Sequence, residues 1–105
     1  MSFKNPNNRC SLSGYVATIG EFKDGQKSID LEIGVSRPPQ VKGGKSYSDY
    51  IPVYVNDPTI VKFIIENLKK GSIVSVKGEL RKWNDGTFKI AAYEVLMKGS
   101  SWQTS

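Results

Sequence analysis

The chain has 105 residues, a formal net charge of +5 at pH 7, a single cysteine and no histidine. This length suits one domain, because two separate cores would each bury too little apolar surface. No apolar run is long enough to span a membrane, and the polar start, MSFKNPNNR, lacks the apolar core of a signal peptide. Cys10 has no partner for an internal disulfide, so we expect a cytoplasmic protein.

The absence of histidine removes the commonest general base, the usual nucleophile pairs and most zinc sites. Carboxylates such as Asp30, Glu32 and Glu79 stand in no recognisable catalytic motif, and exposed strand positions explain them better. We therefore expect a protein that is not an enzyme and that holds no cofactor or metal. The excess of cations favours a polyanionic partner, although solubility alone is an equal explanation.

From Arg9 onward, apolar residues alternate with polar ones, which predicts a first strand. Its inward side holds Cys10, Leu12, Gly14 and Val16. Gly14 inside this strand suggests a bulge or sharp bend, which a small barrel needs where one strand serves two sheets. A turn at residues 23–25 then leads to a second strand, whose inward side holds Ile29, Leu31, Ile33 and Val35.

Residues 37–49 combine prolines and glycines with cations, which predicts a long and functional loop. The third strand, DYIPVYV, follows it. Its inward side holds Ile51, Val53 and Val55. Its outward side carries Tyr50, Pro52 and Tyr54, so the aromatic residues lie outside the core.

Asp57 as N-cap and Pro58 in the first turn predict the start of a helix. Apolar residues recur there at helical spacing: Ile60, Val61, Ile64, Ile65 and Leu68. Lys69 and Lys70 beside Gly71 are interpreted as the C-terminal cap of this helix.

A fourth strand is predicted over residues 73–83. Its inward residues are Val74, Val76, Gly78 and Leu80, and its outward residues are Ser75, Lys77, Glu79, Arg81 and Trp83. A tight hairpin turn at Asn84, Asp85 and Gly86 leads into a fifth strand over residues 87–97. Two registers remain open for that strand. The core side holds either Phe88, Ile90, Ala92 and Leu96 or Ala91, Tyr93, Val95 and Met97.

The predicted order is three strands, one helix and a two-strand hairpin, which is the order of the five-stranded OB-fold β-barrel. The fold class is therefore all-β with one helix between strands three and four. An SH3-like barrel lacks that helix, and a ferredoxin-like fold needs a helix where residues 21–27 form only a turn. The barrel is expected at residues 9–98, between an irregular N-terminal arm at 1–8 and a short polar tail at 99–105.

Binding a single nucleic-acid strand without reading its sequence requires flat rings on which bases stack and cations that contact the phosphates. The outward faces of the third and fourth strands supply both, and the basic loop lies on the usual ligand face of this fold. The candidate binding residues are Arg37, Lys42, Lys45, Tyr47, Tyr50, Tyr54, Lys77, Arg81, Trp83, Phe88 and Lys89. Alternatives stay open: Tyr50 and Tyr54 can instead cover a subunit interface, Phe88 can be a core residue, and Lys77 can be plain surface.

The segments GSIVSVKGELRKW and NDGTFKIAAYEV carry a resemblance to a known family, supported by SLSGYV, DYIPVYV and FIIENLKKGS. Over about residues 8–99 the chain resembles the bacterial and phage single-stranded DNA-binding proteins. The resemblance implies that Tyr50 and Trp83 stack bases. Two other aromatic positions of the family fall near residues 36–37 and at Asn56, which are not aromatic here. Stacking is then sparser, or relocated to Tyr47, Tyr54 or Phe88.

The resemblance further implies protection of single strands in DNA replication, recombination or repair, and a homo-oligomer, either dimer or tetramer. Replication or recombination proteins are possible partners. Bacterial members end in an acidic tail that recruits such partners, whereas this chain ends in GSSWQTS. We therefore expect a compact phage or plasmid type, or a trimmed chain, in the cytoplasm of a bacterium or of the phage host. The alternative function is a protein-interaction OB module such as a primosome-type adaptor. A small hydrolase or nuclease is the third possibility.

Overall fold

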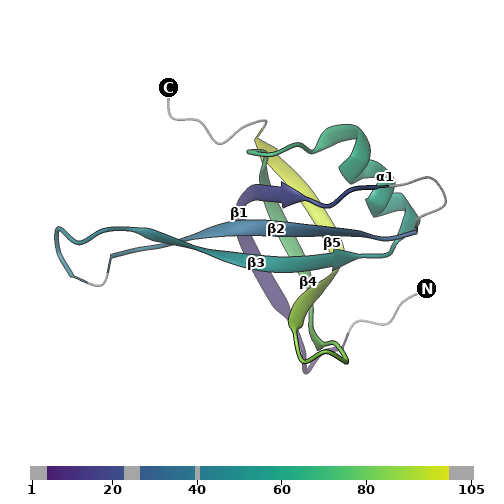
Figure 1. Ribbon diagram of the computed structural model, residues 1–105, viewed down its shortest axis with the longest axis horizontal. Coiled ribbons are helices and arrows are strands. Elements are labelled where there is room, and N and C mark those ends of the chain that lie inside the picture. The colour runs from purple at the N-terminus through teal and green to yellow at the C-terminus, as the bar shows by residue number, and fades with distance from the viewer. Residues whose placement is uncertain (1–4, 23–26, 40, 100–105) are drawn as a thin grey trace.

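The computed structural model describes residues 5–22, 27–39 and 41–99. Its strands close into a barrel in the order β1-β2-β3-β5-β4, which confirms the predicted five-stranded barrel with one helix between strands three and four (Figure 1). The elements are β1 (Cys10–Ile19), β2 (Ile29–Arg37), β3 (Tyr47–Val55), α1 (Pro58–Asn67), β4 (Ile73–Lys82) and β5 (Phe88–Gly99). The turn predicted at residues 23–25, the first half of the N-terminal arm and the tail from residue 100 lie outside the described residues.

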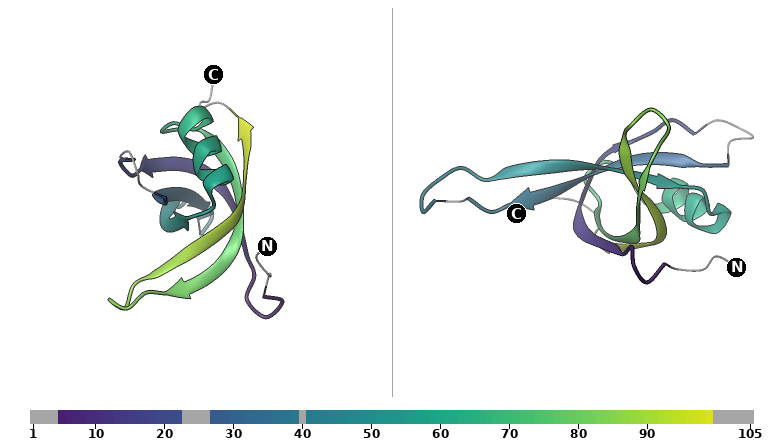
Figure 2. Two further views of the ribbon diagram at one scale, coloured as in Figure 1. Left: turned by 90° about the vertical axis from the view of Figure 1, so that its right-hand side faces the viewer. Right: turned by 90° about the horizontal axis from the view of Figure 1, so that it is seen from below.

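The core of the barrel consists of aliphatic side chains, most of them β-branched, which pack well on a pleated surface. The most deeply buried are Val16, Ile29, Leu31, Ile33, Val53, Val55, Ile64, Val74 and Val76. Val61 and Ile64 turn one face of α1 toward this core. The helix lies at one end of the barrel, and the hairpin between β4 and β5 projects from the other end (Figures 1 and 2).

Helix α1 begins where its sequence predicts. The Asp57 carboxylate accepts hydrogen bonds from the N–H groups of Thr59, at 2.9 Å, and Ile60, at 3.3 Å. The predicted C-terminal cap is wrong, because the helix ends at Asn67 and the chain leaves it in an extended conformation at Leu68. Leu68 is drawn into the core, and Gly71, with φ of 96°, belongs to the following turn.

Strand β1 serves two neighbours, which confirms the predicted bend. Residues 10–15 pair with β4, and residues 15–19 pair with β2. The register shift lies between Val16 and Thr18, so the bulge predicted at Gly14 is found a few residues further along the strand. Gly14 instead permits close approach of β1 to β2, because a Cβ atom there would overlap the carbonyl oxygen of Gly34.

The hairpin formed by β2 and β3 is longer than predicted. The two strands remain paired as far as Arg37 opposite Tyr47, so both ends of the loop predicted at residues 37–49 belong to the ladder. Strand β3 begins at Tyr47 and includes Ser48 and Asp49. The prolines and glycines of the preceding segment predict a loop that extends over these residues. The β2–β3 hairpin extends well beyond the barrel (Figure 1).

A bulge in β5 explains why its alternation left two registers open. Lys77 pairs with Glu94 and Gly78 with Ala92, so Tyr93 is the extra residue. Consequently Ile90 and Ala92 face the core before the bulge, and Val95 faces it afterwards.

Two predictions for β4 are wrong. Leu80, expected inside, is 46% exposed, whereas Glu79, expected outside, is only 7% exposed. The β4–β5 hairpin projects past the end of the barrel (Figure 2), and the pairing of β1 with β4 ends at Gly78, so β1 does not cover Leu80. Glu79 is covered by Arg81 and by the N-terminal arm.

Candidate nucleic-acid interface

The outward face of β3 carries the predicted aromatic residues. Tyr50 is 56% exposed, and Tyr54 lies half-buried on the same face, whereas Val53 and Val55 between and beyond them are buried. Because strand residues advance about 3.3 Å each, the two tyrosines lie about 13 Å apart along the strand. The two rings are therefore separate features of this face.

Trp83 is positioned by the turn that joins β4 to β5. Its N–H donates to the carbonyl of Thr87 at 2.8 Å, and its carbonyl accepts from the N–H of Gly86 at 2.9 Å. Gly86 has φ of 90°, which glycine adopts without strain, so the predicted tight turn is confirmed. The hydrogen bonds on both sides fix the backbone from which the indole ring extends.

The rings of Tyr54 and Trp83 meet edge to face, with centroids 5.4 Å apart and an interplanar angle of 73°. The ammonium nitrogen of Lys89 lies 5.3 Å from the centroid of the Trp83 ring, a cation–π distance. Tyr54 and Trp83 line a cleft of about 320 Å³, which we name the Tyr54–Trp83 cleft. The other lining residues are Asn56, Arg81, Lys82, Asn84 and Ala91. Rings and cations thus surround one hollow on the barrel surface.

The cations at the cleft have partners that a phosphate can replace. Lys89 lies 3.2 Å from the Asp30 carboxylate, and Arg81 lies 2.8 Å from that of Glu79. The Arg81 side chain is 60% exposed although that of Glu79 is only 10% exposed, so the guanidinium remains open to solvent while it binds the carboxylate. These ion pairs orient the two cations, and the Arg81 guanidinium remains accessible to a further anion.

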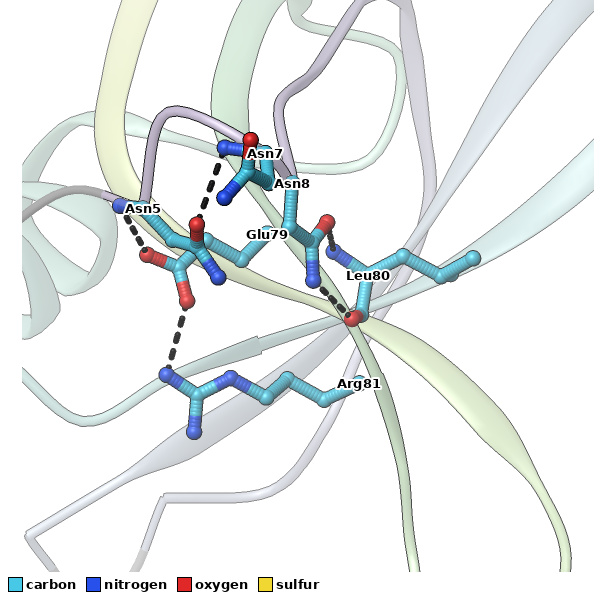
Figure 3. Close-up of polar contacts among 6 residues, drawn as sticks. All are labelled: Asn5, Asn7, Asn8, Glu79, Leu80 and Arg81. Carbon is cyan, nitrogen blue, oxygen red and sulfur yellow. Dashed lines mark hydrogen bonds and ion pairs between the residues drawn. The ribbon is translucent and has the colours of Figure 1, made fainter.

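The N-terminal arm holds the end of β4 that carries Arg81 (Figure 3). The Asn8 side-chain amide donates to the Leu80 carbonyl at 2.8 Å, and its oxygen accepts from the Leu80 N–H at 2.9 Å. The Asn5 N–H donates to one oxygen of Glu79 at 3.1 Å, while Arg81 binds the other. The arm takes the place beside Leu80 that β1 leaves vacant, because pairing of β1 with β4 ends at Gly78.

These contacts give folding a pH dependence through Glu79. Hydrogen bonding from Arg81, then from the Asn5 N–H, holds the pKa of Glu79 below its usual value of 4.5. A carboxyl whose pKa falls on folding stabilises the native state above its unfolded pKa, and this stabilisation disappears as the pH falls through the folded pKa. We expect Glu79→Gln to lose stability less steeply than the wild type below about pH 5 in urea unfolding. Glu66→Gln, which removes an exposed carboxylate from α1, is the control, and equal slopes for all three proteins would contradict the assignment.

Tyr15 is a site residue that the sequence analysis missed. It pairs with Gly34, which in turn pairs with Tyr50 on the other side of β2. The Tyr15 ring lies across Gly34, where a Cβ atom would overlap it. Its hydroxyl oxygen lies 3.4 Å from the Ser48 hydroxyl and 3.5 Å from that of Tyr50. In the sequence, strand alternation puts Tyr15 on the outward side of the first strand, but nothing local shows that it faces a glycine.

The hydrogen bonds of this cluster act oppositely on the two tyrosines. Hydrogen bonding to Ser48, then to Tyr50, lowers the pKa of Tyr15. Hydrogen bonding to Tyr15 raises the pKa of Tyr50. The two phenol groups therefore interact directly through their hydroxyls, close to Gly34. They line a second hollow of about 480 Å³, which we name the Tyr15–Tyr50 pocket.

The structure separates several predicted site residues from these two hollows. Strand alternation puts Tyr47 and Arg37 on the opposite face of the β2–β3 hairpin from Tyr50, and Arg37 binds Asp49 at 2.9 Å. Alternation likewise puts Phe88 on the opposite face of the β4–β5 hairpin from Trp83. Phe88 is 54% exposed, with Lys82 nitrogen 5.8 Å from its ring centroid, so it is not a core residue.

The remaining predicted cations also lie apart. Lys77 faces outward over β1, β4 and β5, where its nitrogen lies 3.6 Å from the Glu94 carboxylate. Lys42 and Lys45 are exposed near the tip of the β2–β3 hairpin. In the part of the chain that the structure describes, no three acidic or cysteine side chains gather to hold a metal ion, and no helix is long and apolar enough to cross a membrane.

A closed five-stranded barrel with a helix between β3 and β4 is an OB fold. No protein-family profile and no curated protein sequence matches the chain. Solved structures of single-stranded DNA-binding proteins do resemble it. Mitochondrial Rim1 of S. cerevisiae has a TM-score of 0.70 at 15% identity, over 90% of this chain and 97% of that one.

Two further structures are similar at slightly higher identity. The single-stranded DNA-binding protein of Plasmodium falciparum, solved in complex with single-stranded DNA, has a TM-score of 0.67 at 24% identity, over 92% of this chain and 98% of that one. The dimeric N-terminal domain of PriB from Thermoanaerobacter tencongensis has a TM-score of 0.61 at 23% identity, over 87% and 96%. These similarities establish the fold.

Proposed function

We propose that this protein binds single-stranded DNA by stacking bases on the rings of its outward face while neighbouring cations contact the phosphates. The observation that carries the proposal is the Tyr54–Trp83 cleft, where two rings meet edge to face under Lys89. The same fold in proteins named for binding single-stranded DNA supports it. Binding, rather than catalysis, is then the activity.

The outward rings define a path for the strand. Tyr15, Tyr50, Tyr54 and Trp83 lie on one face that crosses β1, β2 and β3 and reaches the β4–β5 hairpin. We name this series the aromatic track. Every base has a ring face, so stacking on the track is tolerant of sequence.

Cations on both sides of the track supply the electrostatic part of binding. Arg81 and Lys82 line the Tyr54–Trp83 cleft, and Lys89 lies over the Trp83 ring on the same hairpin. We propose that the other predicted residues contact a longer DNA strand where it leaves the track. They are Arg37, Lys42, Lys45 and Tyr47 on the β2–β3 hairpin, Phe88 on the opposite face of the β4–β5 hairpin, and Lys77 on β4.

We further propose a homo-oligomer that protects single strands during replication, recombination or repair, as a compact phage or plasmid protein in the cytoplasm. A protein-interaction module is the second candidate, favoured by the similarity to the dimeric PriB domain. Under that alternative, Tyr50→Ala and Tyr54→Ala weaken self-assembly first, as light scattering would show. Under single-strand binding, the same variants weaken DNA affinity first.

The test uses tryptophan fluorescence and salt. In a Trp102→Phe background, Trp83 is the remaining tryptophan, and we expect oligothymidine to quench it. Affinity should fall as salt rises, with a log–log slope of about 0.7 per phosphate neutralised, or about 2 if Arg81, Lys82 and Lys89 each neutralise one. Absence of both quenching and a gel shift would exclude the proposed function.

A further inference from the structure

The Tyr15–Tyr50 pocket has a composition unlike the rest of the aromatic track. Besides the two tyrosine rings, it is lined by Thr18, Glu32 and Lys70. It has a volume of about 480 Å³, lies open on the outer face of β1, β2 and β3, and presents more apolar than polar surface. It therefore combines ring surfaces, a carboxylate and an ammonium group in one hollow.

The Glu32 carboxylate is the unexpected group in this pocket. An acidic group beside a polyanion repels the phosphates, so it is compatible with binding only where it meets the bases rather than the backbone. The Thr18 hydroxyl donates to one oxygen of Glu32 at 3.1 Å, which orients the carboxylate. Across β3 the neighbour of Glu32 is Pro52, which brings no donor. Within the part of the chain that the structure describes, no other hydrogen bond or ion pair holds Glu32.

A carboxylate accepts hydrogen bonds through two adjacent oxygens, and the bases differ in what they offer it. Guanine presents two neighbouring donors, its ring N1–H and its exocyclic N2 amino group, on the Watson–Crick edge. Adenine and cytosine present one amino group beside a ring nitrogen that accepts. Thymine presents one N–H between two carbonyl oxygens, which repel a carboxylate. In a single strand these edges are unpaired and open to a protein.

We propose that the Tyr15–Tyr50 pocket binds one guanine base of the strand, with Glu32 accepting from its N1–H and N2 amino groups. This inference rests on the proposed function and adds a base-selective position to an otherwise tolerant track. Tyr15, whose ring crosses Gly34, and Tyr50 provide the ring contacts. Lys70, beside Gly71 at the edge of the pocket, contacts the phosphate.

The experiment compares oligothymidines of about 12 nucleotides, within the range that one OB fold covers, in fluorescence anisotropy. One is all thymidine, one carries a single central guanine, and one carries inosine, which keeps N1–H but lacks the N2 amino group. We expect the wild type to bind the guanine oligomer about tenfold more tightly than the all-thymidine oligomer, since a bidentate base contact discriminates by roughly this factor or more. The inosine oligomer should fall between them.

Glu32→Gln should reduce the preference for guanine to about onefold, because its amide offers one acceptor oxygen where the carboxylate offers two adjacent ones. Glu66→Gln removes one carboxylate from the exposed side of α1 and should keep the wild-type preference. Equal affinities of the wild type for the guanine and thymidine oligomers, or a preference that survives in Glu32→Gln, would overturn the inference. Failure of the wild type to bind any of the oligomers would overturn the proposed function instead.

Discussion

Trp83→Ala is expected to weaken the binding of oligothymidine roughly thirtyfold, because base stacking on one aromatic ring contributes about 2 kcal/mol. The substitution removes three contacts. A base loses its indole platform, and Tyr54 loses the ring that it meets edge to face at 5.4 Å. Lys89 also loses the indole over which its ammonium lies. Fluorescence anisotropy with a labelled oligomer measures the effect at fixed salt.

Two further substitutions at the same position separate stacking from packing. Trp83→Phe keeps a ring and should retain most of the affinity, whereas Trp83→Leu keeps apolar bulk without a ring and should lose nearly as much as alanine. The Tm of each variant, measured in parallel, reports packing. If Trp83→Leu binds as tightly as Trp83→Phe, the ring supports the hairpin and does not stack a base.

The order of elements is predictable from the sequence because its signals are local. Alternation marks each strand, and Asp57 followed by Pro58 marks the start of α1, where the Asp57 carboxylate caps the first N–H groups. The turn before β5 is equally local, since Gly86 supplies the one residue with positive φ that the turn needs. None of these features depends on a distant part of the chain.

The errors concern contacts between distant segments. The bulge at Tyr93 is set by the pairing of β5 with Lys77 and Gly78, and no glycine or proline beside Tyr93 indicates it. Burial of Glu79 requires the N-terminal arm, 74 residues away in the sequence. Likewise the cap at Gly71 fails because Leu68 is needed in the core, which overrides the local preference.

The candidate site divides in the same way. Tyr50, Tyr54 and Trp83 are predictable, because strand alternation alone puts them outside. That Tyr54 and Trp83 touch follows from the parallel pairing of β3 with β5, which the sequence does not contain locally. Tyr15 is missed because its importance depends on Gly34, a partner on another strand.

Gly14→Ala is expected to destabilise the barrel by about 2 kcal/mol, because the new methyl group would overlap backbone rather than a mobile side chain. The nearest atoms belong to the carbonyl of Gly34, with a methyl group of Ile33 at 3.1 Å. Relief requires β1 and β2 to move apart at the point where β1 changes from pairing with β4 to pairing with β2. For a domain of this size, the loss corresponds to a Tm lower by roughly 10 °C.

Gly99→Ala is the matched control, because it makes the same change to the unfolded chain. A Cβ atom at Gly99 would meet only the side chain of Ile73, at 3.4 Å, an ordinary van der Waals contact. Its Tm should stay close to that of the wild type or rise slightly, and equal losses for both variants would contradict the close approach at Gly14. The Tyr15 ring packs against Gly34, so displacement of β2 by Gly14→Ala should disturb the Tyr15–Tyr50 pocket. The Tyr54–Trp83 cleft should be less affected, because it is built on β3 and the β4–β5 hairpin.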